Sequence, residues 1–170
     1  MARAMQKLPV VGLFFLTAGV ALGCGDKLML VMRLRLAQLK LGHPLAILAF
    51  AQRDLPSADS IRQIPSQPAV KRAGHQFQLV EDAARLDQAL KAGKYDLVMA
   101  DASVADELSR RVESVPYRPL VVPVTYKATK AQDSATQKKF HCLLKAPSGS
   151  DEYFDAVDQA LQWKARAAAR

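Results

Sequence analysis

The chain has 170 residues, which is enough for one globular domain and a short targeting segment but crowded for two full domains. Half of the residues are hydrophobic and 24% are charged, so the chain can bury a sizeable core without a framework of disulfides. The formal net charge of +8 is spread along the chain without a basic stripe interleaved with aromatic residues, and this argues against a nucleic-acid partner.

Residues 1–23 have the three parts of a secretory signal. Arg3 and Lys7 come first, the apolar run 8–22 follows, and small residues precede Cys24. This order resembles a bacterial lipoprotein signal, although Ala21 stands where such signals most often have leucine. The resemblance implies lipidation at Cys24 and a membrane-anchored protein on the periplasmic or cell-surface side of a bacterium.

Other interpretations of this N-terminal segment stay open. Residues 8–25 number 18, and a membrane-spanning helix needs about 20, so the segment is also compatible with an uncleaved anchor. Conventional cleavage, or a translation start placed too early, is the remaining alternative.

Cysteine and histidine are too few and too scattered to predict a metal site. If Cys24 carries lipid, Cys142 is left alone in an apolar stretch, where we expect a buried and inert thiol. The three histidines are His43, His75 and His141, and their spacing matches no metal-ligand pattern. We therefore expect no metal and no cofactor.

Residues 24–44 have leucines that fit either a strand or a helix, and we interpret them as a connector that packs on the domain. The run 45–50 is continuously apolar, as in a parallel strand that is covered on both faces. Prolines interrupt the residues that follow, so we expect a short or irregular first helix that ends at 69–73 before Gly74.

Strands and helices then alternate along the rest of the chain. The predicted strands are 75–80, 95–100, 120–124 and 140–144. The predicted helices are 83–92, 104–115, a weak one at 127–138 and a clear one at 151–164, with Ser150 placed to cap the last. The Ala/Arg tail 165–170 is expected to be frayed.

This alternation predicts an α/β domain over 45–164, preceded by the N-terminal hydrophobic signal or anchor helix. The sheet is expected to have five parallel strands in the order 2-1-3-4-5, with helices on both faces. Its expected core includes five apolar side chains, which are Leu97, Val98, Val121, Val122 and Leu143.

In such sheets, ligands bind at the carboxyl ends of the strands. Three polar residues follow predicted strand ends: Asp101, Thr125 and Lys145. The segments Tyr-Asp-Leu-Val-Met-Ala-Asp101, Val-Pro-Val-Thr125 and Leu-Leu-Lys145-Ala-Pro resemble the receiver domain of bacterial response regulators, over roughly residues 45–163. By that resemblance, Asp101 accepts a phosphoryl group, Thr125 contacts it and Lys145 pairs with it.

The chain departs from the receiver pattern at the metal site. Receivers hold Mg²⁺ with an acidic pair just after the first strand, and this sequence has Ala51 and Gln52 there. A hard divalent cation loses its preferred carboxylate ligands. We therefore expect a degenerate site, with Asp101 and Lys145 close together at a partly exposed edge but without phosphoryl transfer.

The sequence thus predicts a membrane-tethered, non-catalytic, receiver-like module in signalling that binds another protein. A receiver beyond the membrane lacks the cytoplasmic kinases that supply aspartyl phosphate, which also argues against activity. Two alternatives remain. One is an active phospho-accepting receiver that uses Asp101, and the other is a lipoprotein that binds a small anion beside Lys145.

Overall fold

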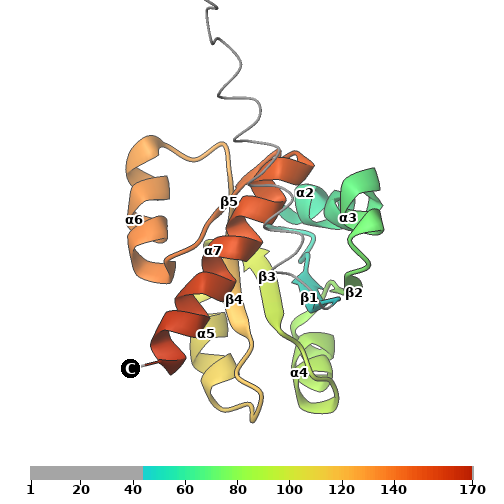
Figure 1. The fold of residues 1–170 in the computed structure, drawn as a ribbon. Helices are drawn as coiled ribbons and strands as arrows, with labels where there is room; N and C mark the ends of the chain where they lie inside the picture. Colours follow the sequence, from blue (N-terminus) through green and yellow to red (C-terminus); the bar gives the residue numbers. More distant parts are fainter. Residues whose placement is uncertain (1–43, 170) are drawn as a thin grey trace, which may run out of the picture.

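The computed structural model describes residues 44–169. The predicted signal 1–23, Cys24 and the connector up to residue 43 lie outside the described residues. Five parallel strands form one sheet in the order β2-β1-β3-β4-β5 (Figure 1). The strands are β1 (Ala46–Phe50), β2 (Gln76–Val80), β3 (Leu97–Asp101), β4 (Leu120–Tyr126) and β5 (Leu144–Ala146). The predicted α/β class and strand order are confirmed.

Helices cover both faces of the sheet, and two hydrophobic clusters fill the space between the layers. One face is covered by α2 (Ala58–Gln63), the 3-10 turn η1 (Ile64–Ser66), α3 (Pro68–Arg72) and α7 (Ser150–Ala168). The opposite face is covered by α4 (Ala83–Ala92) and α5 (Ala105–Glu113). Helix α6 (Lys130–Phe140) stands beside the β4 and β5 side of the sheet (Figure 1).

All five predicted core side chains are buried. Successive residues of a strand point to opposite faces, so Leu97 and Val122 join the cluster under α7 while Val98 and Val121 join the cluster under α4 and α5. Leu143 is also buried but precedes β5 instead of lying in it.

The first helical region is irregular, as its prolines predict. Pro65 and Pro68 each stand at the start of a new helical segment, where the missing N–H group costs little. Gly74 ends the region at φ 72°, a conformation that glycine adopts without a steric penalty.

Three boundaries near the C-terminus differ from the prediction. The fifth strand begins at Leu144 and not at residue 140, because Phe140 is the last residue of α6 and His141 reverses the chain at φ 60°. Helix α7 continues through Ala168 instead of fraying from residue 165, and alanine has the highest helix propensity. The sequence predicts Ser150 to be the N-cap of this helix, but Ser150 is the first helical residue, and Gly149 is the N-cap.

His75 joins the start of β1 to the start of β2. The backbone N–H of Leu45 donates to Nδ1 of His75 at 3.1 Å. The centroid of the His75 ring lies 6.1 Å from the centroid of the Tyr153 ring. Burial lowers the pKa of His75. A protonated imidazole carries a hydrogen on both nitrogens, so protonation also removes the acceptor that Leu45 uses.

We expect the free energy of unfolding to fall as the pH is lowered through about 6.5, because the unfolded chain then binds a proton that folded His75 resists. Urea unfolding of the wild type between about pH 7.5 and pH 5.5 should show this loss, and His75→Gln should show a smaller one. The exposed His141→Gln variant is the control and should keep the wild-type loss. If His75→Gln lost as much unfolding free energy in acid as the wild type does, His75 would not be the source of the pH dependence.

Candidate functional site

Asp101, Thr125 and Lys145 all lie at the carboxyl edge of the sheet, at or near the ends of β3, β4 and β5. The strand register nevertheless separates them. Asp101 is paired with Val124, whereas Thr125 is paired with Lys145. Since neighbouring positions of a strand alternate between faces, Asp101 lies on the α2 and α7 side and the other two lie on the opposite side.

The Asp101 carboxylate accepts four hydrogen bonds from two serines. Ser57 donates its backbone N–H at 3.1 Å and its hydroxyl at 2.6 Å to Oδ2. Ser103 donates its backbone N–H at 2.9 Å and its hydroxyl at 2.7 Å to Oδ1. A carboxylate has about four lone-pair sites, so these bonds use its accepting capacity.

Asp101 is only 5% exposed, and the partly exposed position predicted for it is wrong. Burial acts to raise the pKa of its carboxyl and is the largest single influence. The hydrogen bonds from Ser103 and Ser57 together outweigh burial, so the pKa lies below its ordinary value. The group is therefore a buried carboxylate that the protein keeps ionised.

Thr125 and Lys145 share a different acid, Asp133 of α6. The hydroxyl of Thr125 donates to Oδ1 of Asp133 at 2.9 Å, and Nζ of Lys145 lies 3.1 Å from Oδ2. Asp101 and Lys145, which the sequence predicts to lie close together, form no ion pair, and Lys145 pairs with Asp133 on the other side of the sheet. The predicted trio is thus divided into two separate groups.

The segment after β1 holds a network of charged side chains. Arg53 and Arg62 both pair with Glu81, at 3.0 and 2.9 Å. Hydrogen bonds from Arg62 and then from Arg53 hold the pKa of Glu81 below its ordinary value. Gln52, at one of the positions where receivers carry an acid, lines a small hollow between α4 and α5.

Three residues of the site were not predicted, namely Ser57, Ser103 and Asp133. Ser103 follows Asp101 by two residues, a spacing at which an aspartate side chain often accepts the backbone N–H, so this contact had a sequence signal. Ser57 precedes a helix and reads as an ordinary N-cap. Asp133 lies among polar residues, and nothing in the sequence marks it.

Cys142 is buried as predicted, with its Sγ 3.6 Å from the carbonyl oxygen of Val121. Burial raises the pKa of the thiol to about 11. The thiol is therefore protonated at neutral pH and is a poor nucleophile.

Comparisons of the chain with protein-family models, with curated proteins and with solved structures found no match. Within residues 44–169, no three His, Cys, Asp or Glu side chains are grouped closely enough to hold a metal ion. In the same part of the chain, no helix is both long and apolar enough to cross a membrane.

We expect Asp101→Asn to lower the free energy of unfolding by about 2–4 kcal/mol, because an amide cannot accept all four hydrogen bonds and the two donors of Ser57 are buried. Asp106→Asn is the matched control. Asp106 is an exposed acid that pairs with Lys139, and its loss should cost about 1 kcal/mol or less. Urea unfolding of both variants measures the difference, and equal small effects would contradict a structural role for Asp101.

The Asp101 effect should depend on pH. The pKa of Asp101 is lowered in the folded state, so its stabilising contribution is present above the pKa of the unfolded chain, about 4, and is lost as the pH falls through the folded value. The difference between wild type and Asp101→Asn should therefore shrink in acid.

Proposed function

We propose that this chain is a membrane-tethered, non-catalytic, receiver-like module that binds another protein in a signalling pathway. The observation that carries the proposal is the state of Asp101. Its carboxyl group is buried and hydrogen bonded at both oxygens to Ser57 and Ser103, and these bonds hold its pKa below the ordinary value.

Phosphoryl transfer to a carboxylate needs a free oxygen and cations that balance the charge of the phosphoryl group. Attack by Asp101 requires a bond from Ser57 or Ser103 to break first. Lys145 is held on the other face of the sheet by Asp133. Ala51 and Gln52 offer no carboxylate for a divalent cation where receivers use an acidic pair. These features support a structural role for Asp101.

Incubation with Mg²⁺ and acetyl phosphate, followed by mass spectrometry of the intact protein, tests this proposal. We expect no gain of a phosphoryl group in wild type and the same result in Asp101→Asn. A cytoplasmic receiver of proven activity serves as the positive control. Phosphorylation of wild type that is lost in Asp101→Asn would instead establish an active phospho-acceptor and overturn the proposal.

The tether is the second part of the proposal, and the sequence supports it. Arg3 and Lys7, the apolar run and the small residues before Cys24 stand in the order that lipoprotein processing requires. A lipid at Cys24 would place the module at a membrane and away from cytoplasmic phosphoryl donors.

We expect Cys24 to be lipidated when the chain is expressed in a bacterial host. Labelled palmitate should be incorporated into wild type and not into Cys24→Ser, because the cysteine sulfur is the attachment point. Cys142→Ser removes the other cysteine and should label as wild type does. Equal labelling of wild type and Cys24→Ser would refute lipidation at this residue.

A further inference from the structure

Helix α6 presents an open face to solvent. None of its eleven side chains is fully buried, and Phe140 at its end packs partly against both core clusters. Hydrogen bonds and an ion pair, instead of burial in the core, fix the helix. Thr129 and Gln132 form a capping box at its start, and Asp133 ties it to the sheet.

Positive charge is concentrated on this part of the molecule. Residues 127–145 contain five lysines and one acidic residue, whereas residues 44–126 contain ten basic and ten acidic residues. Lys139 pairs with Asp106, and Lys145 pairs with Asp133. Within the described residues 44–169, the other three lysines have no acidic partner; they are Lys127, Lys130 and Lys138.

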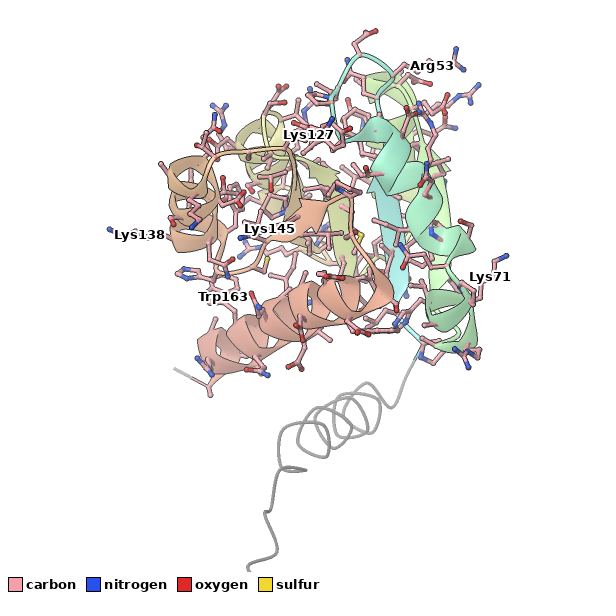
Figure 2. All side chains as sticks on the ribbon, turned by 90° about the horizontal axis from the view of Figure 1, so that it is seen from above. Arg53, Lys71, Lys127, Lys138, Lys145 and Trp163 are labelled. Atoms are coloured by element: carbon pink, nitrogen blue, oxygen red, sulfur yellow. The ribbon has the colours of Figure 1, made fainter. Side chains whose placement is uncertain are left out.

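Three lysines line a hollow between α6 and β5. We call this hollow the lysine groove and define it by Lys130, Lys138, Lys145, Ser134, Gln137 and Leu143. Asp133 also lines it, but both of its carboxylate oxygens are already bonded. Figure 2 shows Lys138 and Lys145 on the same side of the molecule, away from Arg53 and Lys71. The groove thus combines unpaired positive charge with polar side chains.

We propose that the lysine groove binds an acidic segment of a partner protein. This inference rests on the proposed function and names the chemistry of the partner. Unpaired ammonium groups attract carboxylates, and the hydroxyl of Ser134 can donate a hydrogen bond to a bound chain. The amide of Gln137 donates one hydrogen to Gln159 at 2.8 Å and keeps a second for a bound chain. The interaction positions the partner against α6, none of whose side chains is fully buried.

The composition of the groove favours a protein segment over a lipid surface. Binding in a bilayer interface uses large apolar side chains. Four such side chains are exposed within residues 44–169, and none lines the groove; they are Leu79, Tyr117, Tyr126 and Trp163.

Fluorescence anisotropy of two labelled peptides tests the proposal with the full-length chain in a non-ionic detergent. One peptide has about twelve residues rich in Glu and Asp, and the other has Gln and Asn in their place. The test variant is Lys130→Glu with Lys138→Glu. The matched control is Lys71→Glu with Lys91→Glu, which changes the net charge equally at exposed lysines of α3 and α4.

We expect wild type to bind the acidic peptide and not the amide peptide, with an affinity that falls as salt is raised. The test variant should weaken binding at least about tenfold, and the control variant should change it by about twofold or less. Thermal melts of both variants verify that they are folded, which is expected because all four lysines are exposed.

Three outcomes overturn the proposal. If both variants lost peptide binding equally, binding would respond to net charge alone. If wild type bound neither peptide, the lysine groove would not be a peptide-binding site. Binding to phosphatidylglycerol vesicles that only the test variant loses, without peptide binding, would assign the groove to a membrane. Each outcome is independent of the acetyl phosphate result, so failure here is distinct from failure of the proposed function.

Discussion

The carboxylate of Asp101 joins the end of β3 to Ser57, the residue that precedes α2, and this contact crosses the carboxyl edge of the sheet. Strand β3 lies between β1 and β4, so its end is surrounded by the sheet on both sides. The hydroxyl of Ser57 donates its hydrogen bond to Asp101, and the side chain does not cap α2. A long-range contact therefore takes the place of a local one at the start of this helix, and the buried charge is compensated by four donors.

Strand alternation explains why the candidate residues do not form a single site. Thr125 stands one residue beyond Val124, the register partner of Asp101, and one residue along a strand changes the face to which a side chain points. Lys145 shares the register and the face of Thr125, and both contact Asp133. A sequence pattern that places three residues at strand ends specifies the edge of the sheet but not the face.

The sequence predicts the sheet well because its signals are local. Short apolar runs mark the strands, and prolines and Gly74 mark the broken first helix. Contacts between distant segments have weaker signals. Because Phe140 is apolar, the sequence predicts it to be in the fifth strand. It is instead the last residue of α6, and its side chain reaches the core from the helix. Ser57 and Asp133 look like ordinary surface residues, and only the packing of α2 and α6 gives them their partners.

The contact between Lys145 and Asp133 also builds the lysine groove. Asp133 lies on α6, and its two oxygens bond to residues of β4 and β5, so the helix and the strand that form the walls of the groove are held relative to each other. The helix buries no side chain completely, and its position therefore depends on Phe140 and on polar contacts: this one, the Lys139–Asp106 pair and the Gln137–Gln159 hydrogen bond. Asp101, Thr125 and Lys145 at the carboxyl edge are paired within the protein, whereas Lys130 and Lys138 of α6 have no acidic partner within residues 44–169.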